Sequence, residues 1–300
     1  MDYNGIILIN KPPDITSFKV CEIVKKKLKI KKVGHGGTLD PFAAGLLILG
    51  INKGTKLLNV ISDYPKEYTG TIVLGEKRDT FDVTGKIVDI CEEEKLQKIT
   101  EDDILKIKEK FTGAIKQKPP QYSAIKKHGK PLYKYAREGK FVDIPHRTVF
   151  IEKFEIRNFQ LPEFVFSIKC SKGTYIRSIA NDMGEELGVF GFLKELKRVS
   201  INGFSVDESV NLDELSKDDL IHFDNALRIK KVFIRDEYNS LLENGNIINM
   251  DFVSENDLEP NNNELIYIFG KNCSVVGRFL SDKNIIKPEI VYKKLYNKNK

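Results

Sequence analysis

Apolar residues recur along the first two thirds of the chain with both helical and strand spacing. Residues 5–10 form a short apolar run that predicts a buried strand, closed by a Lys-Pro-Pro sequence. Cys21, Val24 and Leu28 then recur at helical spacing, after a Thr-Ser pair that can cap a helix. Alternating or β-branched runs predict further strands at residues 46–51, 68–74 and 164–170.

Two more helices are predicted downstream. Thr100 and Asp103 form a capping box ahead of apolar residues at helical spacing. An amphipathic pattern from Ile176 to Leu187 ends at Gly188, a common stop signal. Residues 116–140 contain two adjacent prolines and no clean period, which indicates a long surface loop or an inserted hairpin.

The character of the chain changes near residue 230. Short β-rich runs appear at residues 231–234, 265–269 and 274–279. They predict a small β-rich C-terminal domain. Strands and helices are intermixed without a regular βαβ repeat, and no phosphate-binding glycine motif follows a strand, so the sequence favours an α+β fold over a nucleotide-cofactor fold.

Composition agrees with a globular protein of two domains. The chain has 300 residues, of which 41% are hydrophobic and 31% charged. No apolar run approaches the roughly 20 residues that span a bilayer. The four cysteines and four histidines are scattered, which disfavours a disulfide framework or a metal site. The simplest interpretation is a cytoplasmic protein in a reducing compartment, with no metal.

Lysines gather in two places, although the net charge is only +6. One cluster spans residues 25–32, and the other spans residues 116–130 with tyrosines among and after its lysines. Basic side chains mixed with aromatic rings suit a phosphate backbone with unstacked bases. A solvated helix face is the alternative for either cluster, and for the first the two interpretations stay equally open.

The segment Gly34–Pro41 has the most unusual composition. Its three glycines permit tight turns and close approach of another backbone. Asp40 precedes Pro41, which disfavours a helical conformation for the aspartate. Taken alone, the Asp-Pro pair is more typical of a helix start, with Asp40 as the N-cap.

Read as a whole, the sequence resembles the bacterial TruB-type tRNA pseudouridine synthases. The resemblance covers residues 5 to about 200, and the C-terminal piece is similar to the small RNA-binding appendage of that family. The matching blocks stand in order along the chain: Asn10–Pro12, Gly34–Pro41, Ala44–Leu46, Lys66–Tyr68, Asp79–Asp82 with Gly85, Gln121–Lys126, Leu132–Tyr133, Tyr135–Arg137, Cys170–Arg177 and Leu196–Arg198.

The resemblance implies a pseudouridine-synthase fold with a curved, mostly antiparallel mixed sheet and a PUA-like β domain. The expected catalytic domain is residues 1–229, with an RNA-gripping insert at about 116–140, and the PUA-like domain is residues 230–300. The implied reaction isomerises uridine 55 in the TΨC loop of tRNA by base flipping. It needs no cofactor, and the family suggests a monomer that acts without a protein partner.

The family motif assigns three catalytic residues. Asp40 matches the nucleophilic aspartate, which is ionised at neutral pH without a partner base. Arg177 matches the arginine that pairs with this carboxylate and keeps it charged. Tyr68 matches the tyrosine whose ring stacks on the flipped uracil and whose hydroxyl can handle a proton.

Other positions match the substrate pocket and the RNA-binding surface. Tyr175 and Leu196 would line the uracil pocket, His35 would lie beside the extruded nucleotide, Asp82 would hydrogen-bond near the site, and Lys11 would support its floor or a phosphate. The expected RNA contacts are Lys126, Lys130, Lys197 and Arg198.

Two other functions remain open at this point. A guide-dependent pseudouridine synthase shares the aspartate motif but needs guide RNA and accessory proteins. A non-catalytic protein that binds or folds tRNA would use the same basic surface. The matches at Asp40, Tyr68 and Arg177 favour chemistry, and the block around residues 122–137 favours the stand-alone enzyme.

Overall fold

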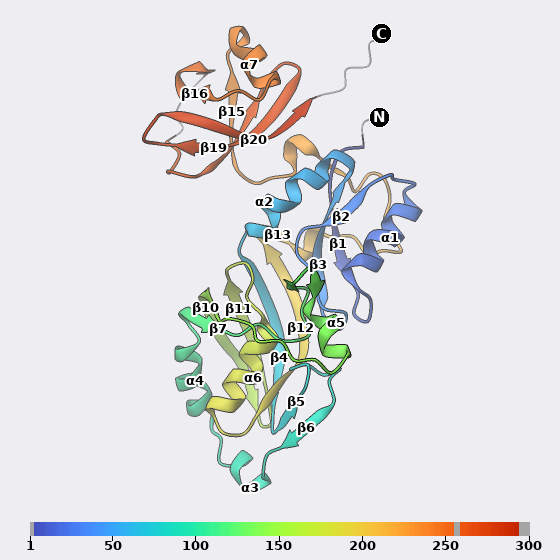
Figure 1. Ribbon diagram of the computed structural model, residues 1–300, viewed down its shortest axis with the longest axis vertical. Helices are drawn as coiled ribbons and strands as arrows, with labels where there is room; N and C mark the ends of the chain where they lie inside the picture. Colours follow the sequence, from blue (N-terminus) through green and yellow to red (C-terminus); the bar gives the residue numbers. More distant parts are fainter. Residues whose placement is uncertain (1–2, 255–258, 294–300) are drawn as a thin grey trace.

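The computed structural model describes residues 3–254 and 259–293. The molecule is elongated, with a large sheet in its lower and middle part and a smaller β domain at the upper end (Figure 1). No helix in the described part of the chain is long and apolar enough to cross a membrane.

The large sheet has the strand order β14-β1-β3-β12-β4-β11-β10-β7, with β2 beside β3 and β13 beside β12. All these pairs are antiparallel except β3 with β12, so the sheet is mixed but mostly antiparallel. Its strands are β1 (Gly5–Lys11), β2 (Val33–His35), β3 (Ala44–Ile51), β4 (Lys66–Leu74), β7 (Gly113–Gln117), β10 (Arg147–Gln160), β11 (Glu163–Cys170), β12 (Gly191–Ile201), β13 (Phe204–Ser205) and β14 (Ile221–His222).

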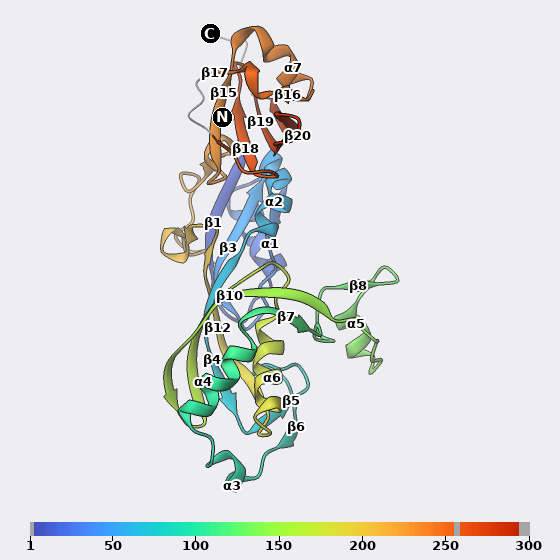
Figure 2. The same ribbon diagram turned by 90° about the vertical axis from the view of Figure 1, so that its left-hand side faces the viewer.

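Helices cover this sheet and connect its strands. The helices α4 and α6 lie side by side against the lower half, whereas α1 packs near β2 in the upper half (Figures 1 and 2). The helices of this part are α1 (Ser17–Lys27), α2 (Leu58–Asp63), α3 (Glu93–Leu96), α4 (Glu101–Lys110), α5 (Leu132–Arg137) and α6 (Ile176–Glu186).

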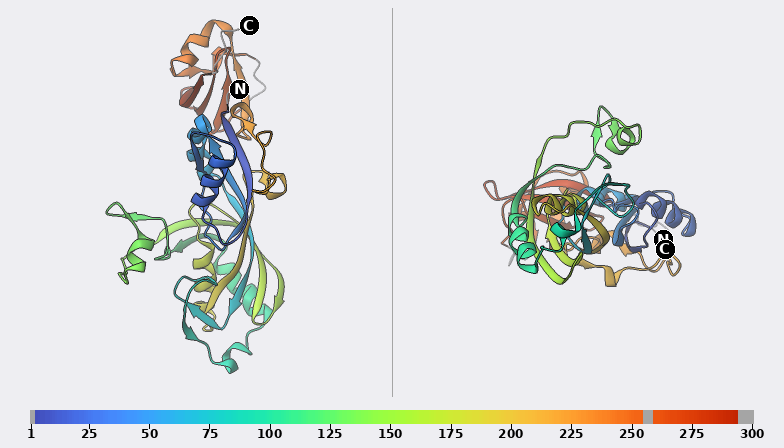
Figure 3. Two further views of the ribbon diagram at one scale, coloured as in Figure 1. Left: turned by 90° about the vertical axis from the view of Figure 1, so that its right-hand side faces the viewer. Right: turned by 90° about the horizontal axis from the view of Figure 1, so that it is seen from below.

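Two small ribbons extend from the large sheet. The ribbon of β5 (Glu76–Arg78) and β6 (Ile87–Ile90) lies near its lower end. The other ribbon, β8 (Lys126–Lys127) with β9 (Lys130–Pro131), precedes α5. Together with α5 it forms an arm that projects sideways from the body (Figures 2 and 3). His128 and Gly129 both have positive φ, as a tight two-residue hairpin turn requires.

The C-terminal domain is a second sheet with the order β16-β20-β19-β18-β15-β17, accompanied by α7 (Asn239–Glu243). Its strands are β15 (Lys230–Ile234), β16 (Ile248–Asn249), β17 (Val253–Ser254), β18 (Leu265–Phe269), β19 (Cys273–Leu280) and β20 (Ile285–Lys293). Apolar residues of both domains share one buried cluster, in which Phe223 stacks on Tyr292 with a centroid distance of 4.2 Å.

The predicted α+β class and the elements set by local pattern are confirmed. Thr16 caps α1, Thr100 and Asp103 form the capping box of α4, and α6 begins at Ile176. The sequence between residues 116 and 140 forms the end of β7 and the hairpin arm. The long strands β10 and β12 are not among the predicted elements.

Candidate active site

The loop between β2 and β3, residues 36–43, carries Asp40 and is fixed from below. The Ser17 hydroxyl, on the first turn of α1, donates to the Leu39 carbonyl at 3.1 Å and accepts from the Leu39 N–H at 2.9 Å. A side chain at Gly45 would place its Cβ 2.3 Å from the Arg198 carbonyl oxygen. The absence of a side chain at this glycine therefore allows β3 and β12 to meet directly behind the loop.

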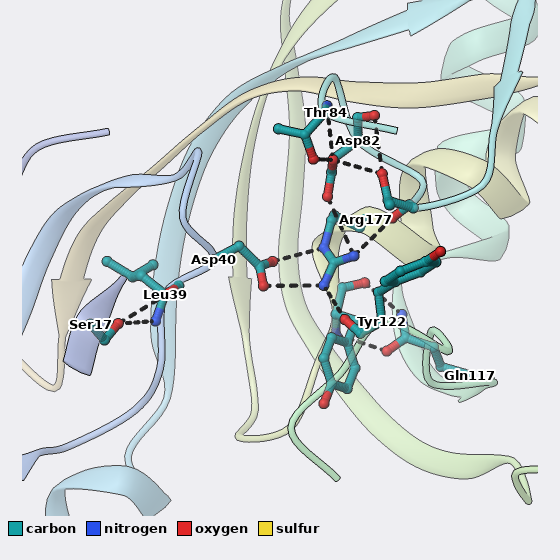
Figure 4. A network of polar contacts seen from close by, with 10 residues as sticks. Ser17, Leu39, Asp40, Asp82, Thr84, Gln117, Tyr122 and Arg177 are labelled. Atoms are coloured by element: carbon teal, nitrogen blue, oxygen red, sulfur yellow. Dashed lines mark hydrogen bonds and ion pairs between the residues drawn. The ribbon is translucent and has the colours of Figure 1, made fainter. Parts of the chain in front are cut away.

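Arg177 holds the Asp40 carboxylate in two places. Its Nε donates to Oδ2 of Asp40 at 2.7 Å, and its Nη2 donates to Oδ1 at 3.1 Å (Figure 4). The Arg177 side chain is 4% exposed, whereas that of Asp40 is 32% exposed. The buried arginine thus fixes the carboxylate from behind, and the carboxylate remains accessible to a substrate.

The remaining N–H groups of Arg177 contact two further segments, the turn that contains Thr80 and Asp82 and the segment around Tyr122. Its Nη1 donates to the Thr80 carbonyl at 2.8 Å, and its Nη2 donates to the Tyr122 carbonyl at 3.0 Å. Asp82 Oδ2 lies 3.4 Å from Nη1. The two carbonyls and the two carboxylates together surround the guanidinium. They supply the hydrogen-bond acceptors and the negative charge that a buried cation requires.

Asp82 is itself held by the tight turn after β5. Its Oδ1 accepts from the Thr80 hydroxyl at 2.8 Å, the Thr84 hydroxyl at 2.6 Å and the Thr84 N–H at 3.0 Å (Figure 4). The residue is 4% exposed. Asp82 thus lies beside the guanidinium that holds Asp40, and its carboxylate is buried.

The central strands β4 and β12 bring Tyr68, Leu196 and Arg198 to one face of the sheet. Tyr68 lies directly opposite Arg198, and Leu196 is two residues before Arg198 on the same strand. Tyr68 and Leu196 are each 8% exposed. Burial raises the pKa of the Tyr68 hydroxyl, with Arg198 opposing the shift, so this tyrosine is neutral at physiological pH.

Arg198 differs from the sequence-based prediction of an RNA contact. It is 1% exposed, and its Nε and Nη2 donate to the carbonyls of Leu46 and Gly37 at 2.8 and 3.0 Å. A phosphate cannot reach a guanidinium in that position. Its neighbour Lys197 is exposed, on the opposite face of β12, and keeps the access that an RNA contact needs.

Lys11 is fully buried beneath the Asp40 loop. Its Nζ donates to the carbonyls of Pro12, Pro41 and Ala43 at 2.9, 3.0 and 2.6 Å. Burial lowers the pKa of this ammonium to about 8. Of the two predicted roles, support for the floor of the site fits this geometry, because the amine has no surface from which to bind a phosphate.

His35 is the last residue of β2 and leads into the Asp40 loop. Burial lowers the pKa of its imidazole, and the nearby charge of Arg198 lowers it further. The ring is therefore neutral at pH 7. Its buried Nδ1 has no hydrogen-bond partner among the residues that the structure describes.

Tyr175 stands immediately before α6 and is fixed on two sides. The Gln117 side chain accepts from the Tyr175 N–H at 2.8 Å and donates to its carbonyl at 2.9 Å. The Arg147 guanidinium lies over the Tyr175 ring, 4.8 Å from its centroid. The ring is thus held next to the turn that carries Arg177.

The predicted RNA contacts Lys126 and Lys130 lie away from these residues, on the hairpin of the arm. Lys130 forms an ion pair with Glu138 at 2.5 Å, whereas Lys126 is exposed. The structure therefore brings Asp40, Arg177 and Asp82 together, whereas the arm lysines lie on the hairpin.

Several residues that contact the site are not among the predicted site residues. Thr80 and Tyr122 contribute backbone carbonyls, and a carbonyl is available at any residue. Gln117 acts through tertiary contacts with Tyr175. Of these four residues, only Ser17 has a local sequence signal, because a small polar residue at this position indicates the start of a helix. Among the described residues, no group of three or more His, Cys, Asp or Glu side chains could hold a metal ion.

The fold matches known structures over nearly the whole chain. One chain of the crystal structure of a Cbf5-Nop10-Gar1 complex superposes with a TM-score of 0.73 at 22% identity, covering 97% of this chain and 85% of that chain. A structure of an H/ACA RNP bound to a substrate RNA containing 2′-deoxyuridine gives 0.71 at 22% identity, covering 97% and 88%. The fold class is therefore the Cbf5-like α+β fold with a PUA-like C-terminal domain.

The sequence comparisons define the family. The model for the N-terminal domain of TruB family pseudouridylate synthases matches residues 25–176. The tRNA pseudouridine synthase B of Acholeplasma laidlawii is 44% identical over 82% of this chain and 86% of its own length. That of Thermotoga maritima is 39% identical over 85% and 82%. The chain belongs to the TruB family of pseudouridylate synthases, which are isomerases, and the predicted family is confirmed.

Proposed function

We propose that this protein isomerises uridine 55 in the TΨC loop of tRNA, acting alone and without a cofactor. The observation that carries the proposal is the ion pair in which buried Arg177 holds a partly exposed Asp40 carboxylate. The relatives that share up to 44% identity are named tRNA pseudouridine synthase B, which supports tRNA as the substrate.

In this mechanism the target uridine leaves the loop and enters the pocket beside Asp40. Extruding a base costs a few kcal/mol, and the cost is lowest where the base is not paired in a duplex. Tyr68 and Leu196 supply the walls of the pocket, and stacking on an aromatic ring returns about 1–3 kcal/mol. His35, at the entrance to the Asp40 loop, would contact the extruded nucleotide as a neutral ring.

Asp40 acts as the nucleophile. Arg177 supplies a fixed positive charge beside it, so the carboxylate is ready to react without a general base. The C1′–N1 bond breaks, the uracil turns while it remains in the pocket, and a bond forms between C1′ and C5. Asp40 is released in the same course, the hydrogen on C5 leaves as a proton, and N1, freed from C1′, takes up a proton. Uridine and pseudouridine therefore have the same composition, and no oxidant is consumed.

Outside the pocket, exposed lysines of the arm and of β12 would contact the phosphates around the loop. Lys126 and Lys197 have the required exposure. The six lysines of residues 25–32 lie in the last turn of α1 and in the segment after it. Lys27 donates to the carbonyls of Leu212 and Asp213. At least this member of the cluster has an internal structural role.

The test is to incubate the purified protein alone with an unmodified tRNA transcript and map pseudouridine by carbodiimide modification and primer extension. We expect a single stop that reports position 55, and no stop with a transcript that carries cytidine there. Modification that appears only after a guide RNA is added would favour the guide-dependent alternative. Tight binding without modification would favour a tRNA-binding or tRNA-folding protein.

A further inference from the structure

Five lysines at the C-terminal end of α1 and just beyond it form a basic surface. They are Lys25, Lys26, Lys29, Lys31 and Lys32. All five are exposed, and within the described part of the chain none of them forms an ion pair. Positive charges this close together repel one another, and an anionic partner relieves that repulsion. The RNA contacts described above give these five lysines no role.

Phe18 lies on the same exposed face of α1, in its first turn. Residues three, four and seven positions apart share one side of a helix, so Phe18 aligns with Lys25. The buried apolar residues of α1 point the other way, into the core. Glu22, also on the exposed face, pairs with Lys19 at 3.6 Å. Phe18 itself is 67% exposed, and a large apolar ring in water contributes little to the stability of the fold.

The position of Phe18 brings this helix face to the edge of the candidate active site. The preceding residue, Ser17, makes two hydrogen bonds to the backbone of Leu39, which directly precedes Asp40. Ser17 and Leu39 lie on the side of Asp40 away from Arg177 (Figure 4). From Phe18 the exposed face leads away from the loop to Lys25, over about 10 Å at about 1.5 Å per residue.

The arm and α1 lie on the same side of the large sheet (Figures 2 and 3). In Figure 2 the helix α6, whose first turn carries Arg177, lies on that side as well. The Asp40 carboxylate that Arg177 holds is 32% exposed. A polynucleotide bound over this carboxylate can therefore contact the arm with one part and α1 with another.

We propose that the exposed face of α1 is a second RNA-binding surface, which holds the strand of the tRNA substrate next to the target uridine. A base beside an extruded nucleotide loses a stacking partner, and the Phe18 ring replaces that partner. The phosphates that follow bind Lys25 and Lys26, which contact them as point charges without reading the sequence. This inference rests on the function proposed above and extends the contact with the substrate beyond the pocket and the arm.

The first test uses the absence of tryptophan from the chain. In Phe18→Trp the new ring is the only tryptophan, and an aromatic surface is kept at this position. We expect the unmodified tRNA transcript to lower its fluorescence at least about twofold at saturation, because a base stacks on the ring. The matched control is Ile90→Trp, at a residue of β6 that is 65% exposed, and its fluorescence should change little. Unchanged fluorescence of Phe18→Trp with tRNA bound would overturn the stacking contact.

The affinity for tRNA gives a second measure of the same contact. Phe18→Ala should weaken binding of the transcript about tenfold, the scale of one stacked base, whereas Phe18→Trp should bind within about twofold of the unaltered protein. Because Phe18 is exposed, its removal takes no contact from the core, and the midpoint of urea unfolding should stay unchanged. Unaltered affinity of Phe18→Ala would overturn the proposed role of this ring.

The third test concerns the lysines. Lys25→Gln and Lys26→Gln in one protein should weaken tRNA binding several-fold and reduce the slope of log affinity against log salt by about 1.5. Lys98→Gln with Lys106→Gln is the matched control, since it removes the same charge from exposed lysines before and on α4. An equal fall in this control would overturn the assignment to α1, because affinity would then follow the net charge alone. An unchanged slope in the α1 variant would overturn the phosphate contact.

Two further outcomes separate this inference from its alternatives. Vesicles of phosphatidylglycerol carry negative charge without bases. If they change the fluorescence of Phe18→Trp and tRNA does not, the face binds a lipid surface and the proposal is overturned. If the unaltered protein binds the transcript without modifying it, the function proposed above fails instead. The fluorescence and the salt dependence still decide the contact in that case, because both report binding alone.

Discussion

At the residue scale, the site depends on buried charges that satisfy one another. Arg177 binds Asp40 and two carbonyls, and Asp82 lies 3.4 Å from the same guanidinium. The sequence alone favoured a helix cap for Asp40, and only the family resemblance indicated its pairing with Arg177. The carbonyls of Thr80 and Tyr122 could not be predicted, because backbone groups carry no sequence signature.

Asp82→Ala tests this charge network. The change removes the carboxylate that accepts from two threonine hydroxyls, and it removes one of the two carboxylates beside Arg177. We expect a loss of about 2–4 kcal/mol in the free energy of unfolding. Activity should fall at least tenfold, because Arg177 loses one of the groups that fix it beside Asp40. Urea unfolding and single-turnover rates measure the two effects. Asp89→Ala, at an exposed position of β6, should cost less than about 0.5 kcal/mol, and equal losses in the two variants would contradict the network.

His35 makes a prediction about pH. Its pKa in the folded protein lies below the ordinary value of 6.5, so the unfolded chain takes up a proton first as the pH falls. The stability that this residue contributes is fully present above pH 6.5 and is lost as the pH drops below it. The slope from one proton is at most about 1.4 kcal/mol per pH unit.

Urea unfolding between pH 5 and 7.5 measures that slope. His35→Asn should flatten it, whereas His128→Asn, at the exposed turn of the arm, should not. A slope that both variants leave unchanged would show that His35 titrates alike in the folded and unfolded chains.

At the element scale, local pattern predicts the ends of helices and isolated strands but not the central strand of the sheet. The caps of α1 and α4 depend on residues three apart, which the sequence displays. Strand β12 contains Leu193 and Leu196 at helical spacing, with Glu and Lys between them. Its pairing with β4 and β3 overrides that preference. Lys197 and Arg198 point to opposite faces of the strand, but because both are basic the sequence does not indicate which of the two is buried.

The two lysines on the hairpin of the arm, Lys126 and Lys130, should contribute differently to tRNA binding. Lys126 is exposed, whereas Lys130 is already paired with Glu138. Lys126→Gln should weaken tRNA binding several-fold and reduce the slope of log affinity against log salt by about one. Lys130→Gln should change both less. The measurement is tRNA affinity at salt concentrations from 50 to 300 mM. An unchanged slope for Lys126→Gln would exclude a phosphate contact at this position.

At the scale of the whole molecule, the two domains share apolar surface. The large sheet ends with β14 at His222, and β15 begins the second sheet at Lys230. Phe223, in the segment between them, packs on Tyr292 of β20 and edge-on against Tyr267 of β18. The change in composition near residue 230 indicated a new domain, but it could not show that the two cores are continuous. That continuity arises only from contacts between distant segments.

We therefore expect the domains to unfold together. Phe223→Ala should lower the free energy of unfolding by about 3–5 kcal/mol, the range for a buried aromatic residue. Phe233→Ala, at a phenylalanine that is 60% exposed, should cost less than about 1 kcal/mol. Differential scanning calorimetry should give one transition for the unaltered protein. Two separated transitions would contradict a shared core.

The most direct test of the central claim is tritium release from a tRNA transcript labelled at uracil C5 and carrying its only labelled uridine at position 55. Tritium leaves C5 only when the new bond to C1′ forms there. We expect the unaltered protein to release about one equivalent per tRNA, and Asp40→Asn to release none while it still binds the transcript. Release by Asp40→Asn within tenfold of the unaltered rate would contradict the assignment of Asp40 as the nucleophile.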